Sequence, residues 1–124
     1  MDRIEKMIST AEKSYSEEYL KKYRRFYPFL GLLGKPSDYG RFITNANAIL
    51  KFDASSDLPK IRYRTLIIGG GEDKIVGAQA SYDLQYMIPG SELFMYKGLG
   101  HAAYEEESED FYQRVFIFLE KDQD

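Results

Sequence analysis

The sequence of 124 residues contains no cysteine, a single histidine and no long apolar run. Without cysteine the chain can form neither a disulfide nor a thiolate nucleophile, and thiolate metal sites are excluded as well. Its formal net charge of -3 argues against nucleic acid as a partner, because binding to phosphates needs clustered positive charge. No segment approaches the roughly 20 apolar residues that a membrane span requires, and the first twenty residues do not resemble a signal peptide. We therefore expect no membrane association and a cytoplasmic location.

The composition that is present is typical of a folded protein. Hydrophobic residues make up 44% of the chain and charged residues 30%, a balance found in globular proteins rather than in disordered ones. The length allows one domain and is too short for two ordinary ones.

Residues 1–57 have the pattern of a helical segment. Ser14 followed by Glu17 has the spacing of a capping box, so we predict a helix from this point, carrying a stripe of tyrosines and ended by Pro28. The apolar residues after position 38 recur at helical spacing, which predicts a second helix beginning near Ser37.

Residues 58–124 alternate between strand and helix patterns. We predict a strand within 61–70, a helix over 78–88, a strand over 92–98 and a last helix with Ser108 as its N-cap. This order predicts an α/β fold with two parallel strands joined by a helical crossover. Two parallel strands are marginal alone and leave exposed edges, so we expect the other strands of the sheet to lie on another polypeptide segment.

The only histidine, His101, follows the second predicted strand, and Asp73 follows the first. The carboxyl ends of adjacent parallel strands meet at one edge of a sheet, where open α/β sheets place their sites. A carboxylate hydrogen-bonded to one imidazole nitrogen leaves the other nitrogen free to act as a general base. The sequence therefore predicts that Asp73 and His101 lie close together and form part of a catalytic site.

Structural roles are the competing interpretation of these residues. An aspartate in a strand-to-helix turn is most often a helix cap, and Glu72 is an alternative acid for the site. The run GGGEDK matches neither a dinucleotide-binding motif nor a phosphate-binding loop. The acidic run 105–110 is better explained as negative charge near a helix N-terminus than as a metal site. We expect no metal and no cofactor.

The segment 59–119 resembles the C-terminal portion of an α/β-hydrolase of the serine hydrolase type. In that family a strand leads into a G-x-x-D turn with the acid of the catalytic triad, matched here by residues 70–73, and a later G-H pair carries the histidine, matched by Gly100 and His101. The resemblance implies that Asp73 and His101 are the triad acid and histidine, that residues 1–57 correspond to the helical lid, and that the substrate is a small acyl compound.

The sequence departs from that family in one respect that affects function. None of its serines lies in the G-x-S-x-G motif that carries the nucleophile upstream of the lid. We therefore expect an incomplete α/β-hydrolase fold, inactive as this chain alone, that hydrolyses an ester, amide or related acyl group only with a missing N-terminal half. The alternative is a non-catalytic α/β interaction module that associates through its exposed sheet edge, either with another chain or with a second copy of itself.

Overall fold

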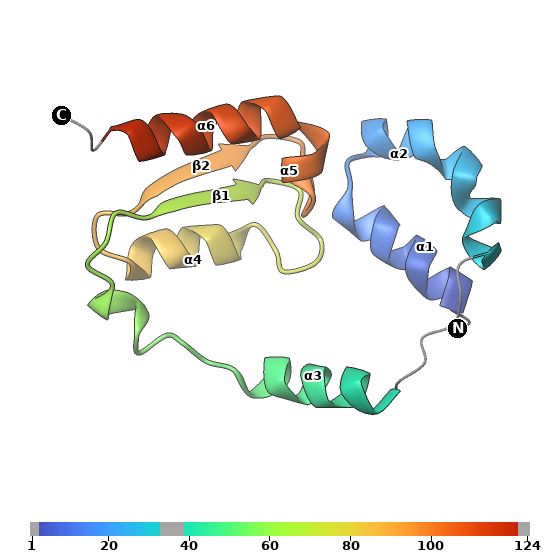
Figure 1. Ribbon diagram of the computed structural model, residues 1–124, viewed down its shortest axis with the longest axis horizontal. Coiled ribbons are helices and arrows are strands. Elements are labelled where there is room, and N and C mark those ends of the chain that lie inside the picture. Colours follow the sequence, from blue (N-terminus) through green and yellow to red (C-terminus); the bar gives the residue numbers. More distant parts are fainter. Residues whose placement is uncertain (1–2, 33–38, 122–124) are drawn as a thin grey trace.

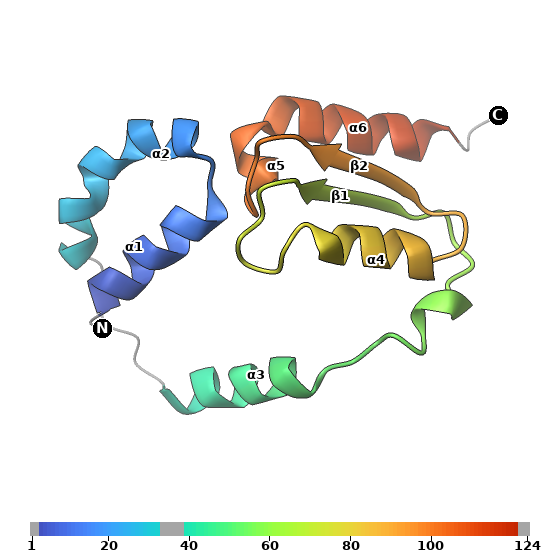
Figure 2. The same cartoon turned by 180° about the vertical axis from the view of Figure 1, so that it is seen from behind.

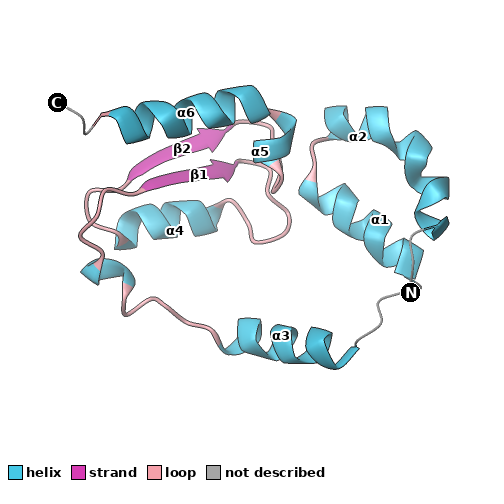
Figure 3. Ribbon diagram, viewed as in Figure 1, coloured by secondary structure: helices cyan, strands magenta, loops and turns pink. Residues whose placement is uncertain are grey.

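The computed structural model describes residues 3–32 and 39–121 of the chain (Figure 1). The first half of the chain is helical, and the second half alternates between strands and helices, as the sequence predicts (Figure 3). The first half contains, in chain order, α1 (Arg3–Ser14), α2 (Glu17–Tyr23), the 3-10 helix η1 (Arg24–Leu32), α3 (Tyr39–Lys51) and the 3-10 helix η2 (Leu58–Lys60). The second half contains β1 (Leu66–Gly70), α4 (Gln79–Met87), β2 (Glu92–Tyr96), α5 (Ala103–Glu106) and α6 (Ser108–Glu120).

The two strands form a parallel pair, which confirms the predicted α/β arrangement. Leu66 lies opposite Glu92 at one end of the ladder and Gly70 lies opposite Tyr96 at the other. Helix α4 makes the crossover from β1 to β2. Figures 1 and 2 show the sheet between α4 and α6. The carboxyl ends of β1 and β2 therefore meet at one edge, next to α5.

The alternation of side chains along β2 explains how each face of the sheet is covered. Phe94 and Tyr96 face α6, where the Arg114 guanidinium lies over the Phe94 ring, with 3.3 Å between the guanidinium carbon and the ring centroid. Met95 faces the other way, toward α4. A Cβ on Gly69, the register partner of Met95, would lie 2.9 Å from Met95 Sδ and even closer to Ser81 of α4.

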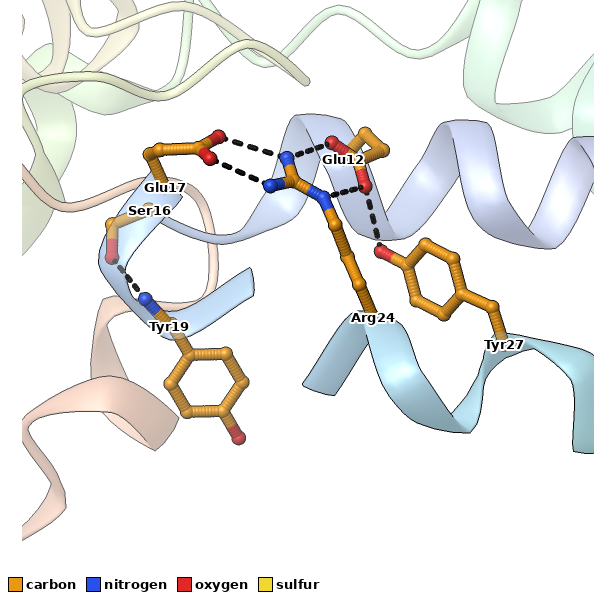
Figure 4. Close-up of polar contacts among 6 residues, drawn as sticks. All are labelled: Glu12, Ser16, Glu17, Tyr19, Arg24 and Tyr27. Carbon is orange, nitrogen blue, oxygen red and sulfur yellow. Dashed lines mark hydrogen bonds and ion pairs between the residues drawn. The ribbon is translucent and has the colours of Figure 1, made fainter. Parts of the chain in front are cut away.

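Arg24 ties together the helices of the N-terminal segment (Figure 4). Its guanidinium binds Glu12 of α1 with 2.7 Å between Nη2 and Oε2, and Glu17 of α2 with 2.6 Å between Nη1 and Oε1. Tyr27 of η1 donates its hydroxyl hydrogen to Glu12. The hydrogen bond from Arg24 lowers the pKa of Glu12 to about 2. One charged network thus fixes α1, α2 and η1 relative to one another.

The start of α2 differs from the prediction. Ser14 is the last residue of α1, and the N-cap of α2 is Ser16, whose hydroxyl accepts a hydrogen bond from the backbone N–H of Tyr19. Pro28 does not end a helix, since it lies inside η1. Ser37, where we predicted the second helix to begin, lies outside the described residues.

The C-terminal half also departs from the prediction at two boundaries. The first strand begins at Leu66, and the preceding residues 61–65 are not part of it. Ser108 is the first residue of α6 rather than its N-cap; Glu107 occupies the N-cap position without a side-chain cap. The extra turn α5, which no sequence pattern predicted, explains the shift because it ends directly before Glu107.

The buried core of the described residues is small. It comprises Leu20, Ile67, Ile88, Tyr96, Ala102 and Ala103. Many large apolar side chains remain exposed, and α3 carries the clearest example, because Ile49 is 75% and Leu50 83% exposed. Both views place α3 away from the sheet layers (Figures 1 and 2). Within the part of the chain that is described, no helix combines the length and the apolar character needed to cross a bilayer.

Candidate active site

Asp73 lies in the tight turn that leaves β1. The backbone of this turn is held against the end of β2, because the N–H of Gly71 donates to the carbonyl of Tyr96 and the N–H of Glu72 donates to the carbonyl of Leu99, each at 2.8 Å. The Asp73 side chain is only 9% exposed. Its Oδ1 accepts hydrogen bonds from the backbone N–H groups of Ile75 at 2.7 Å and Val76 at 3.1 Å. One carboxylate oxygen therefore stabilises the turn.

The other carboxylate oxygen meets the histidine. Asp73 Oδ2 lies 2.8 Å from His101 Nδ1, and the His101 side chain is 45% exposed. This contact confirms the predicted proximity of the two residues. The competing interpretation of Asp73 as a helix cap is wrong, because Ala78 occupies the N-cap position of α4 and Asp73 Oδ1 binds N–H groups of the turn before that helix.

The electrostatics of the pair decide which nitrogen of His101 carries the proton. Burial by itself raises the pKa of Asp73, but the hydrogen bonds from His101 and from the Ile75 and Val76 backbones outweigh it and lower the pKa below its ordinary value. An ionised carboxylate can only accept a hydrogen bond, so Nδ1 must donate. Nε2 of a neutral His101 is then left with a free lone pair, which is the state a general base requires.

Two glycines allow the loops that carry these residues to touch. A Cβ on Gly70 would lie 2.6 Å from the carbonyl oxygen of Leu99 and closer still to that of Gly100. A Cβ on Gly100 would lie 2.5 Å from the carbonyl oxygen of Ser14. Any side chain at either position would push backbone apart. Gly70, the last residue of β1, and Gly100, in the loop after β2, thus bring together the Asp73 turn, the His101 loop and the corner between α1 and α2.

Other acidic residues that the sequence offered are used elsewhere. The side chain of Glu105 accepts a hydrogen bond from Tyr15, Glu106 binds Ser16, and Asp110 binds both Tyr96 and Arg114. Across residues 3–32 and 39–121 no three His, Cys, Asp or Glu side chains are grouped so as to hold a metal ion. Sequence reasoning missed the contacts of Tyr15 and Ser16, since partners 90 positions apart leave no local pattern.

Comparison with known proteins finds relatives of the sequence and of the fold. No family model matches the sequence. Over 84 residues the chain is 31% identical to the polyketide synthase ThaQ of Burkholderia thailandensis, a match that covers 68% of this chain and 4% of ThaQ. Over 77 residues it is 34% identical to RutD of Stutzerimonas stutzeri, which bears the name carbamate hydrolase, with 62% of this chain and 29% of RutD covered. The chain thus spans less than a third of either relative.

Solved structures show the fold over nearly the whole chain. An esterase from Exiguobacterium antarcticum superposes with a TM-score of 0.76 at 24% identity, covering 96% of this chain and 43% of the esterase. An α/β-hydrolase enzyme from a Medee basin deep-sea metagenome library superposes with a TM-score of 0.76 at 25% identity, covering 89% of this chain and 42% of the enzyme. The chain has a partial α/β-hydrolase fold.

Proposed function

We propose that the chain supplies the acid and the general base of a serine hydrolase that acts on an ester, amide or related acyl group. The observation that carries this proposal is the 2.8 Å contact between Asp73 Oδ2 and His101 Nδ1, made at the carboxyl ends of two adjacent parallel strands. The similarity to RutD over 62% of the chain supports the hydrolase class, and the carboxylate–imidazole contact supports the role of these two residues within it.

The proposed mechanism assigns one task to each residue. Nε2 of His101 takes the proton of a serine hydroxyl as the serine oxygen attacks the carbonyl carbon, and the imidazolium then gives that proton to the leaving group. Asp73 keeps Nδ1 protonated and stabilises the imidazolium that forms. Water, activated by the same nitrogen, then hydrolyses the acyl-serine and regenerates the free enzyme.

The serine and the oxyanion donors come, in this proposal, from a second polypeptide segment. None of the nine serines of the chain lies in the motif of a nucleophile elbow. The esterase neighbour extends well beyond the matched 43% of its length. We propose that a segment equivalent to this remaining part binds here, adding strands to the two-stranded sheet and covering apolar side chains that are exposed in the described residues.

A fusion protein tests this function directly. The chain replaces the matching C-terminal part of the Exiguobacterium antarcticum esterase, and the purified fusion is treated with a fluorophosphonate, which labels a serine only when a base activates it. We expect labelling in the fusion, and strong loss of labelling in the His101→Ala and Asp73→Asn variants. Glu72→Gln is the matched control, because Glu72 is exposed and lies next to Asp73; it should label normally.

The fusion also provides the result that would contradict the proposal. Circular dichroism and a cooperative thermal transition establish whether the fusion has folded. A folded fusion that is not labelled, or one that is labelled equally well without His101, rules out the assigned roles. In that case the alternative is favoured, an interaction module that associates through the exposed edge of its two-stranded sheet and in which the pair is structural.

A further inference from the structure

The corner between α1 and α2, residues 14–16, contacts the loop that carries His101. The backbone N–H of Ala102 donates to the carbonyl of Ser14 at 2.8 Å. Ser14 ends α1, so its carbonyl has no partner within that helix, and the histidine loop supplies the missing donor. Gly100 packs so closely on the same carbonyl that it leaves no room for a Cβ. Both chain neighbours of His101 therefore touch one residue of the corner.

Two carboxylates extend this contact beyond the histidine. Both oxygens of Glu106 bind Ser16: Oε1 accepts from the backbone N–H at 2.8 Å, and Oε2 accepts from the hydroxyl. Oε2 of Glu105 accepts from the Tyr15 hydroxyl at 2.5 Å. Charged acceptors make stronger hydrogen bonds than neutral ones. Figures 1 and 2 both show the α1–α2 corner beside α5, which contains the two glutamates.

His101 itself contributes little to the placement of its loop. Its side chain is nearly half exposed and its contact with Asp73 is a single hydrogen bond. The loop must therefore be restrained through the residues on either side of the histidine. Hydrogen bonds weaken steeply with distance and angle, so a small movement of the loop would break the contact between Nδ1 and Asp73.

We propose that the α1–α2 corner is a positioning element for His101, with Ser16 and Glu106 as positioning residues that act through the loop. This inference rests on the proposed function, because the position of His101 matters for turnover only if His101 is the base. The helical segment is then part of the catalytic apparatus. A shift of α1 or α2, caused by a substrate or a partner, changes the alignment of the base.

The single histidine makes the test possible without any activity. In the chain labelled with 15N-histidine, one imidazole reports which nitrogen carries the proton when the ring is neutral. We expect the parent to carry it on Nδ1. Glu106→Gln replaces one of the two acceptor oxygens that bind Ser16 by an NH2 group, and Ser16→Ala removes the hydroxyl donor. Both variants should increase the fraction of neutral His101 that is protonated on Nε2. Ser16→Thr keeps the hydroxyl and should restore the parent state.

Glu109→Gln is the matched control, because Glu109 is exposed and its side chain makes no hydrogen bond or ion pair with the residues that the structure describes. In the esterase fusion, Glu106→Gln should lower kcat by about 10- to 100-fold, the effect of a misplacement on the order of 1 Å, and leave KM for a short ester unchanged.

The inference is overturned if Glu106→Gln and Ser16→Ala lower only the melting temperature and leave the protonation state of His101 and kcat unchanged, since the corner is then merely structural. If the fusion is inactive in every version but the protonation state still changes, the proposed function fails and the positioning role stands.

Discussion

Replacing Gly70 by alanine tests the packing between the two loops that carry Asp73 and His101. The added methyl group would overlap the carbonyl groups of Leu99 and Gly100. Those atoms belong to backbone, so no flexible side chain can move aside. Forcing extra carbon into a packed site costs about 1–3 kcal/mol. The reduced backbone freedom of alanine in the unfolded chain offsets about 0.5 kcal/mol of this cost.

The expected change is large enough to measure by thermal unfolding. An unfolding entropy of about 2.1 cal/mol/K per residue, taken over 124 residues, gives about 0.26 kcal/mol/K for the chain. A net loss of about 2 kcal/mol therefore lowers Tm by about 8 °C. Gly71→Ala is the control, because its Cβ would lie 3.3 Å from the nearest atom, the carbonyl oxygen of Tyr96, and should cause less than half of that shift.

The same variant should affect the site. Since the carbonyls of Leu99 and Gly100 must move to admit the methyl group, the histidine loop separates from the Asp73 turn, and His101 should lose its fixed Nδ1-protonated state. A Gly70→Ala variant with the Tm of the Gly71→Ala control and an unchanged imidazole spectrum would show that the two loops do not pack in this way.

Further predictions concern activity, acid stability and association. The chain alone should hydrolyse p-nitrophenyl acetate no faster than an equimolar amount of free imidazole, and its serines should not react with the fluorophosphonate; labelling that depends on His101 would reveal a nucleophilic serine within the chain. In the esterase fusion, Asp73→Asn should lower kcat by about 10⁴-fold; an activity close to that of the parent fusion would remove Asp73 from the mechanism. Arg24 lowers the pKa of Glu12 from 4.5 to about 2, so this carboxylate contributes stability above pH 4.5 that is lost as the pH falls toward 2. Between about pH 7 and about pH 3, the free energy of unfolding measured with urea should accordingly fall less for Glu12→Gln than for the parent. An equal fall in both proteins would contradict the ion pair. Light scattering should find the isolated chain associated with further copies of itself, through an apolar contact that we expect to exceed about 1,000 Å². A folded, strictly monomeric chain at high concentration would show that its surface needs no partner.

The sequence predicted the part of the site that depends on strand order. Asp73 and His101 each follow a strand, and a parallel pair must place both at one edge, so their proximity could be predicted without coordinates. The helix between the strands was likewise well defined, because Pro89 and Gly90 limit its end. The predicted helix over 78–88 and the observed α4 (Gln79–Met87) differ by one residue at each end.

The sequence failed where a distant residue decides between local alternatives. Ser14 and Ser16 both offer a hydroxyl near the start of α2, and the Ser14–Glu17 spacing favoured Ser14. The structure uses Ser16, where Glu106 binds both the backbone N–H and the hydroxyl. The choice between Ser14 and Ser16 could therefore not be made from neighbours in sequence. The predicted cap at Ser108 failed for a local reason, since α5 ends directly before Glu107 and α6 then begins at Ser108 itself.

The positions of Asp73 and His101 are well fixed although the buried core of the described residues is small. The Asp73 turn and the His101 loop are fixed mainly by backbone hydrogen bonds and by contacts at Gly70 and Gly100. Such bonds need only the carboxyl edge of two strands and one helical corner, so the pair can be arranged without a complete sheet. The apolar side chains of α3, in contrast, find little cover in the described residues. The partner segment proposed above would therefore contribute mostly burial and the nucleophile, and the geometry of the acid and the base would already be present before it binds.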